Sequence, residues 1–363
     1  MRIDLEARGQ PSVLMIWLSP VIAIVITLIV GAIMFAFMGL EPLNALYVYF
    51  VQPLTNVYQL QELVVKATPL IMIGVGLSVC FLSNNWNIGA EGQFVMGGIA
   101  GSWVALTFYG MEGLWILPLM MIAGALGGLL WALLPAFFKA RFNANEILTS
   151  LMLTYVALQF LDYLVRGPFR DPDGFNFPES RLFSPSGTMP LLTDGGRMHL
   201  GAIFSVIAAI AVAILLWRTI KGFEVKVSGE APRAARFAGF SEKGMVYFSF
   251  LLSGALAGLA GITEVAGPIG QLLPVISPGY GFTAIIVAFL GRLNPIGVVF
   301  AGLLLALTYI GGENAQILLQ VPGDATGVFQ GILLFLILAC DTLIKYRIKI
   351  TRSGGRQTAK AEG

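Results

Sequence analysis

The chain contains a long series of apolar runs, each about 20 residues long, and this repetition restricts its fold more than any other feature. An α-helix rises about 1.5 Å per residue, so about 20 residues cross the roughly 30 Å of hydrocarbon in a bilayer. Backbone groups need internal partners in lipid, and runs of this length favour helices over a barrel. We therefore predict an all-α polytopic membrane protein with about ten transmembrane helices, near residues 17–40, 62–82, 92–109, 114–137, 147–165, 199–217, 245–266, 279–291, 295–312 and 326–344.

Composition agrees with this class. Hydrophobic residues make up 57% of the chain and charged residues only 12%, which is unlike a soluble domain. The formal net charge of +2 is too small to indicate nucleic acid as a partner, and the basic residues lie beside apolar runs. Membrane lipids are therefore the expected surroundings.

The distribution of basic residues predicts the orientation. The first apolar run is too long for the core of a signal peptide, so we expect it to remain as a helix. With a cytoplasmic N-terminus and ten crossings, seventeen of the 22 Lys and Arg residues fall inside and five outside. Both termini are then cytoplasmic. The regions are a cytoplasmic N-terminus (1–16), a transmembrane domain (17–344) with an external loop (166–198) and a cytoplasmic loop (218–244), and a basic cytoplasmic tail (345–363).

Two polar segments interrupt the apolar pattern, at residues 83–93 and 267–281. They occupy equivalent positions if residues 62–165 and 245–344 form two four-helix units of opposite topology, that is, an inverted repeat. Broken helices in such repeats are typical of a transport pathway.

The first interruption supplies most candidate pathway residues, because polar side chains at membrane depth need partners or a water-filled cavity. The alternative is that these side chains cap helix ends and hold a tight turn. Asn145 and Glu146 likewise resemble a helix N-terminus first and a pathway lining second. Trp86 could instead be an interfacial anchor. The candidates are Asn84, Asn85, Trp86, Asn87, Glu91, Gln93, Asn145 and Glu146.

The cytoplasmic loop predicts a short helix between Gly229 and Gly239. Pro232 suits a first helical turn and Gly239 a C-terminal stop. A helix of about two turns is not stable alone in water, so a partner protein or the membrane surface must dock it. Its candidate contact residues are Gly229, Glu230, Arg233, Ala234, Ala235, Arg236, Ala238 and Gly239.

Several of these motifs together resemble the permeases of nucleoside-type ABC importers, within the branched-chain amino acid and simple-sugar permease superfamily. The resemblance rests on the cytoplasmic loop, on Trp86 to Gln93, on Asn145 to Leu153 and on Gly167 to Pro172, and it spans roughly residues 60–345. It implies a type II ABC importer permease fold. It also makes 229–239 the coupling helix, which fits a cleft on a cytoplasmic ABC ATPase subunit.

Further partners follow from the same resemblance. It implies an extracytoplasmic substrate-binding lipoprotein and a second permease chain, as a heterodimer or alternatively a homodimer, in a bacterial inner membrane. The segment Asn87 to Gln93 resembles the nucleoside branch, so a purine nucleoside is the first expected substrate and a simple sugar the second. We expect no cofactor in this chain, because the partner subunit uses the ATP.

Other function classes are weaker. The chain has no G-x-x-x-x-G-K-[ST] sequence to hold ATP phosphates, and its single histidine lacks the neighbours of a metal or hydrolase site. We therefore expect a transporter subunit and not an enzyme. An ion-coupled secondary transporter stays open, with Glu91, Asp162 and Glu264 as coupling candidates, although all three lie near predicted span ends. A passive channel also stays open.

Overall fold

The computed structural model describes residues 2–7, 13–193 and 195–351. The chain divides into two compact units. One is formed by residues 1–42 and 327–363 together, and the other by residues 43–326. The candidate residues of the sequence all fall in the second unit.

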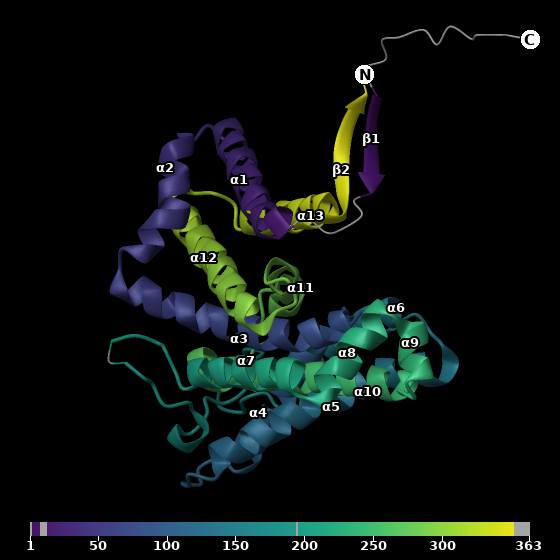
Figure 1. Ribbon diagram of the computed structural model, residues 1–363. Helices are drawn as coiled ribbons and strands as arrows, with labels where there is room; N and C mark the ends of the chain where they lie inside the picture. The colour runs from purple at the N-terminus through teal and green to yellow at the C-terminus, as the bar shows by residue number, and fades with distance from the viewer. Residues whose placement is uncertain (1, 8–12, 194, 352–363) are drawn as a thin grey trace, which may run out of the picture. The chain divides into compact units, whose positions relative to one another are not determined.

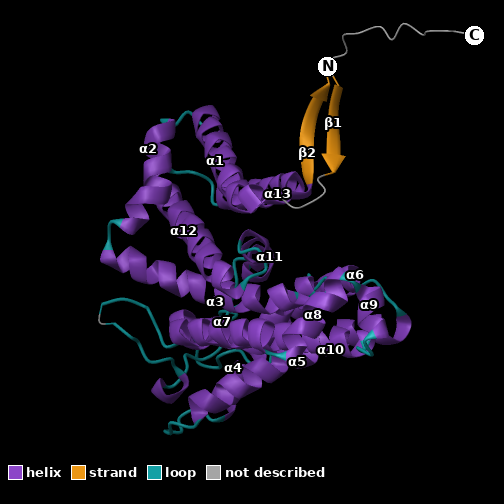
Figure 2. Cartoon of the chain, in the orientation of Figure 1, coloured by secondary structure: helices purple, strands orange, loops and turns teal. Residues whose placement is uncertain are grey.

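The first unit joins the two ends of the chain. Strand β1 (Arg2–Ala7) pairs with β2 (Tyr346–Thr351) as an antiparallel sheet. Helix α1 (Val13–Phe37) follows β1 in the chain, and α13 (Ala325–Lys345) precedes β2. Figure 2 shows these strands at the chain ends. In this unit Phe35 of α1 packs on Phe329 of α13, with ring centroids 5.4 Å apart.

This sheet corrects the all-α prediction at the two termini. In both segments polar and apolar residues alternate with period two, which is the pattern of a strand. The register also sets Asp4 opposite Lys349 and Glu6 opposite Arg347, an arrangement of charges that favours antiparallel pairing. The sequence-based prediction examined these segments only for charge and missed the alternation.

Among the described residues of the second unit, the named secondary-structure elements are all helices. It begins with α2 (Pro42–Leu46), a π-helical turn (Tyr47–Val51) and a 3₁₀ turn (Gln52–Leu54). The helices that follow are α3 (Val57–Leu82), α4 (Ala90–Thr107), α5 (Ile116–Phe142), α6 (Glu146–Arg166), α7 (Gly201–Arg218), α8 (Ile220–Glu230), α9 (Pro232–Phe237), α10 (Glu242–Glu264), α11 (Tyr280–Leu290) and α12 (Pro295–Leu319). A second π-helical turn (Val265–Ile269) extends α10, and a 3₁₀ turn (Pro185–Gly187) lies in the loop before α7.

Each predicted apolar span falls on one of these helices or on α1 or α13. Among the described residues, six helices are long and apolar enough to cross a membrane: α3, α5, α6, α7, α10 with its π-helical turn, and α12. Helix α11 is apolar but shorter. The number of ten crossings and the inverted repeat therefore stay predictions.

Helix starts follow from capping residues that the sequence supplies. The side chains of Asn56, Asn145 and Asn294 accept backbone N–H groups at the first turns of α3, α6 and α12. Ser241 does the same for α10. These acceptors satisfy N–H groups that have no partner within the helix.

Small residues line the core of the second unit, where α4, α5 and α10 each pack against the other two. Figure 1 shows these helices in the same part of the unit. A Cβ placed on Gly97 of α4 would lie 2.2 Å from the Cα of Gly258 in α10. A Cβ on Gly128 of α5 would lie 2.2 Å from the carbonyl oxygen of Gly254. Glycine at these positions lets the helix backbones touch, which is how helices associate in membranes without a hydrophobic driving force.

Candidate functional site

The first interruption is a tight turn between α3 and α4, fastened to α10. Asn84 has a φ of 57°, a left-handed conformation that asparagine tolerates better than most residues. The Asn85 side chain is buried, and its Nδ2 donates to Ser83 Oγ at 2.9 Å and to Ser249 Oγ at 3.0 Å. The turn is thus held by its own residues and by one hydroxyl of α10.

Asn87 and Gln93 form a closed pair of hydrogen bonds inside the bundle. Asn87 Nδ2 donates to Gln93 Oε1 at 2.9 Å, and Gln93 Nε2 donates back to Asn87 Oδ1 at 3.0 Å. Asn87 also donates to Ser253 Oγ at 3.2 Å and accepts from the Gly89 N–H at 3.1 Å. Both side chains are at most 1% exposed. Their polar atoms are therefore used within the protein, as burial requires.

Lys139, at the end of α5, connects this turn to α6. Its Nζ donates to Asn85 Oδ1 at 2.8 Å and forms an ion pair with Glu146 Oε1 at 2.5 Å. The Trp86 N–H lies 3.4 Å from the same Glu146 oxygen. Glu146 thus joins the turn through Lys139, while its neighbour Asn145 caps α6 from an exposed position.

Trp86 belongs to an aromatic cluster between α3 and α11. Its ring centroid lies 5.3 Å from Phe81 and 6.0 Å from Phe289, and its Nε1 donates to Asn84 Oδ1 at 3.2 Å. The side chain is 37% exposed. These contacts fit an anchor, and they leave part of the indole free to meet another molecule.

The second interruption meets the first. After the π-helical turn, Gly270 and Gly279 adopt positive φ values of 76° and 96°, and α11 begins at Tyr280. Glu91, 3% exposed, accepts the Gly281 N–H on its Oε2 at 2.6 Å. A carboxylate suits this place because the first N–H groups of a helix lack partners within it. Glu91 therefore caps a second broken helix, an arrangement that the sequence did not reveal.

The loop 166–198 supports the second interruption. The Phe183 N–H donates to the Gly270 carbonyl at 2.8 Å, and the Met189 N–H to the Ala266 carbonyl at 2.8 Å. Ser180 bonds Leu272 in both directions, at 3.0 Å and 2.9 Å. The polar backbone left by the broken helix is satisfied by this loop.

His199 closes the loop just before α7. Its side chain is 1% exposed, and its Nδ1 accepts the Gly201 N–H at 3.1 Å. Burial lowers the pKa of His199 to about 4, although the charge of Glu62 opposes the shift. The imidazole is therefore neutral at pH 7, and its Nε2 has no hydrogen-bond partner in the protein.

The predicted cytoplasmic helix exists as α9. Pro232 is its first residue, and Gly239 follows its end with a φ of 83°, as the sequence predicted. Gly229 and Glu230 are instead the last residues of α8. Gly229 is there for space, since a Cβ on it would lie 1.9 Å from the Leu82 carbonyl oxygen of α3.

The two faces of α9 differ in exposure. Ala235 is only 4% exposed, so its side chain faces the protein, and its contact with a partner stays a prediction. The outward residues are Ala234, Ala238, Arg233 and Arg236, and Arg236 pairs with Glu242 at 2.5 Å. Phe237, which the sequence analysis did not select, is 95% exposed.

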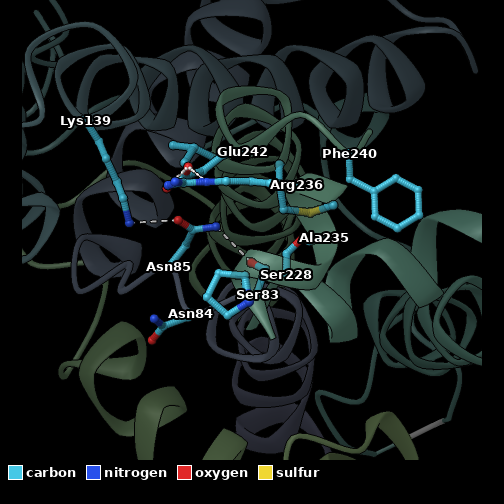
Figure 3. Close-up of a pocket in the computed structure, with 12 residues that line it drawn as sticks. Ser83, Asn84, Asn85, Lys139, Ser228, Ala235, Arg236, Phe240 and Glu242 are labelled. Atoms are coloured by element: carbon cyan, nitrogen blue, oxygen red, sulfur yellow. Dashed lines mark hydrogen bonds and ion pairs between the residues drawn. The ribbon is translucent and has the colours of Figure 1, made fainter. Parts of the chain in front are cut away.

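A pocket of about 270 Å³ lies between α9 and the first interruption (Figure 3). It brings Ala235 and Arg236 together with Asn84 and Asn85, which are about 150 positions away in the sequence. Lys139 lines the same pocket and carries its hydrogen bond to Asn85 there. The remaining lining residues are Ser83, Ser228, Pro232, Phe240, Glu242, Met245 and Val246.

Sequence analysis missed Lys139, Ser249 and Ser253 as partners of the first interruption. Lys139 was counted only as a cytoplasmic charge, although a single amine at the end of an apolar helix is itself a signal for a nearby acceptor. The two serines lie four residues apart in α10, a spacing that puts them on one helix face. That spacing could have identified the surface on which the asparagines pack.

Taken together, the apolar helices and the paired helix breaks define a multi-pass helical membrane protein. Comparison with known proteins is specific. The family described as branched-chain amino acid transport system / permease component matches residues 59–338. The chain belongs to this family and is an ABC transporter permease, which confirms the resemblance inferred from the motifs.

Three relatives show the range of this family. A glucose ABC transporter permease protein, TsgB13 of Haloferax volcanii, is 36% identical over 100% of this chain and 98% of its own length. The guanosine permease protein NupP of Bacillus subtilis is 32% identical over 93% of this chain and 97% of its own. The nucleoside permease protein NupB of Lactococcus lactis is 31% identical over 82% and 84%.

Family membership decides between the function classes left open by the sequence. ABC permeases are transport subunits and not enzymes, and they act with a separate ATPase. This favours ATP-driven transport over an ion-coupled transporter or a passive channel.

Proposed function

We propose that this permease forms the translocation pathway of an importer for a nucleoside, with a purine nucleoside first, delivered by an extracytoplasmic binding protein. The observation that supports this most strongly is the 32% identity to a guanosine permease over 93% of the chain. A simple sugar is the second candidate, because a glucose permease is 36% identical over the whole chain.

The outward face of α9 is the proposed docking surface for the ATPase. A protein partner is supported by Phe237, whose side chain is 95% exposed beside the exposed Arg233. An aromatic ring and a guanidinium are the residue types that dominate protein interfaces. Behind this surface, residues of α9 and Asn85 of the first interruption line the same pocket, so the docking surface lies next to that turn.

The remaining arrangement follows from the family and from charge. The proposed assembly contains a second permease chain, as a heterodimer or a homodimer, a cytoplasmic ABC ATPase subunit and an extracytoplasmic binding lipoprotein, with both termini of this chain cytoplasmic. Glu91 and the residues around it, where the two interruptions meet, belong to the proposed pathway wall. ATP is used by the ATPase and not by this chain.

Uptake measurements test the substrate. Cells that lack their own systems would express this permease with its neighbouring transporter genes, and initial uptake of labelled guanosine, adenosine and glucose would be compared. The proposal expects uptake of the nucleosides, competed by unlabelled guanosine. Glucose uptake without nucleoside uptake would select the second candidate, and uptake of neither would refute both.

Two further arms test the energy source and the orientation. Uptake should survive collapse of ion gradients by ionophores while ATP is maintained, and should stop when the P-loop lysine of the ATPase is replaced. Single cysteines at Phe175 and Phe237, which are 94% and 95% exposed, should label from opposite sides of the membrane. Labelling of both by an impermeant reagent outside intact cells would contradict the topology.

A further inference from the structure

A second group of polar residues lies away from the first interruption, and we call it the Glu264 cluster. Gln59, Glu62 and Lys66 occupy positions i, i+3 and i+7 of α3, so they share one helix face. Glu264 ends α10, Tyr280 begins α11, and Asn314 lies on α12. These six residues belong to elements that pack together within the second unit.

Hydrogen bonds and ion pairs join several members of the cluster to one another and to neighbouring residues. Gln59 Nε2 donates to Asn314 Oδ1 at 2.9 Å, and Lys66 pairs with Glu313, beside Asn314, at 3.1 Å. Glu62 holds Arg197 of the loop before α7 through two hydrogen bonds. Lys66 and Arg197 are the cations whose charges reach Glu264, and Tyr280 lies beside its carboxyl group.

The cluster nevertheless leaves buried polar atoms unused. Glu264 Oε2, Tyr280 Oη, Asn314 Nδ2 and Gln59 Oε1 have no hydrogen-bond partner in the protein. The Glu264, Tyr280 and Asn314 side chains are only 7%, 0% and 8% exposed. Buried polar groups are normally paired because desolvation is costly. Four unused atoms in one cluster therefore indicate that something else binds there.

The chemistry of these atoms limits the ligand. Glu264 and Gln59 offer acceptors, Asn314 offers a donor, and the Tyr280 hydroxyl can do either. The charges of Glu62 and Lys66 are already met by Arg197 and Glu313. An uncharged solute with several hydroxyl groups matches this set, since each hydroxyl both donates and accepts. The ring of Tyr280, edge-on to Tyr309 at 5.5 Å and Phe94 at 6.1 Å, adds an aromatic wall.

Exposure decreases along the cluster in the direction a solute would take. Glu313 and Arg197 are 53% and 50% exposed, Lys66 is 19% exposed, and Glu264 is buried. Tyr280 then leads directly to Gly281, whose N–H is held by Glu91. Polar groups thus run from the surface to the place where the two interruptions meet.

From these observations we infer that Glu264, Tyr280 and Asn314 form a solute-contacting site that binds the hydroxyl groups of the transported nucleoside or sugar. The inference rests on the proposed function and specifies where that solute touches the permease. The unused atoms gain their hydrogen bonds during transport, so losing one of them weakens the contact without weakening the folded protein.

The test uses the complete transporter in proteoliposomes, with guanosine and glucose as probes. Tyr280→Phe, Asn314→Leu and Glu264→Gln are compared with Ser102→Ala, a control whose buried hydroxyl bonds the Gly98 carbonyl of its own helix at 2.6 Å. The readout is solute transported per ATP hydrolysed, because a general loss of folded protein lowers both quantities together. We expect the ratio to fall about tenfold in the three variants, the effect of one hydrogen bond to the solute. The control should keep the wild-type ratio.

The outcomes distinguish failure of the proposed function from failure of the proposed site. If the wild-type protein transports neither probe, both the proposed function and this site are refuted. Wild-type transport with unchanged ratios in all three variants removes the site alone, as does an equal fall in Ser102→Ala. Tyr280→Phe keeps the test decisive, because the hydroxyl it deletes has no protein partner whose loss could unfold the chain.

Discussion

The first interruption and the Glu264 cluster both contain buried asparagine and glutamate side chains, yet they differ in how their polar atoms are used. The side-chain amides of Asn87 and Gln93 form hydrogen bonds with each other, and Asn87 also bonds Ser253 and the backbone. Glu264, Tyr280 and Asn314 each keep an atom without a partner. A satisfied polar network stabilises a fold, whereas an unsatisfied one costs stability and is kept for binding. Burial alone therefore does not identify a pathway residue.

The largest effect is expected when the satisfied network is broken. Asn87→Leu removes the partner of Gln93 and leaves its buried amide unpaired, which should cost about 3 kcal/mol of stability. Thermal unfolding of the detergent-purified protein would measure the loss. Adding Gln93→Leu should recover part of it, because neither amide is then stranded. A single variant as stable as wild type would contradict the role assigned to this pair.

His199 lies near Glu62 of the Glu264 cluster, and its Nε2 has no hydrogen-bond partner. It tests whether such a buried group lowers the stability of the protein at acid pH. Burial lowers its pKa from 6.5 to about 4, so the unfolded chain binds more protons between those values. The free energy of unfolding should therefore be highest above about pH 6.5. It should decrease by at most about 3 kcal/mol as the pH drops to 4. His199→Gln should flatten this part of the profile of unfolding temperature against pH. An equally steep profile in the variant would assign the acid sensitivity to other groups.

Glu91 sharpens the comparison, since it lies where the two regions meet but is itself satisfied. Glu91→Gln keeps an acceptor for the Gly281 N–H, so it should cost about 1 kcal/mol or less. As a member of the proposed pathway wall, the variant should nevertheless show reduced guanosine uptake at matched membrane amount, because the carboxylate is lost from the wall. Uptake equal to wild type would remove Glu91 from the pathway and leave it as a cap of α11.

The smallest effect on stability is expected from Tyr280→Phe. The deleted hydroxyl has no partner, so the unfolding temperature should stay unchanged or rise slightly even as transport falls. Differential scanning of both proteins in the same detergent would show this. A clear loss of stability would mean that the hydroxyl is used in the folded state and that the two regions do not differ as described.

Much of the fold could be predicted because it depends on local signals. Apolar run lengths located the helices, Asn145 marked the start of α6, and Pro232 and Gly239 bounded α9. The two interruptions were recognised from polar residues and prolines. What depends on packing between distant segments was missed: the bond from Gly281 to Glu91, and the inward direction of Ala235.

The Glu264 cluster shows the same limit. Glu264 was considered in the sequence only as an ion-coupling candidate, because its neighbours come from three other helices and a loop. The spacing of Gln59, Glu62 and Lys66 on α3 was readable, but nothing in it says which acceptors remain unused. That property exists only once the partners have been placed.

The pairing of β1 with β2 has a consequence for the parity of the membrane crossings. Residues 2–7 and 346–351 are hydrogen bonded along their length, so the two ends of the chain lie on the same side of the bilayer. The chain between them must then cross an even number of times. Six and ten crossings both satisfy this rule, and any odd number is forbidden. If one of the shorter helices, such as α11, enters and leaves the bilayer on the same side, it does not count as a crossing. A second segment must then also be gained or lost as a crossing to keep the number even.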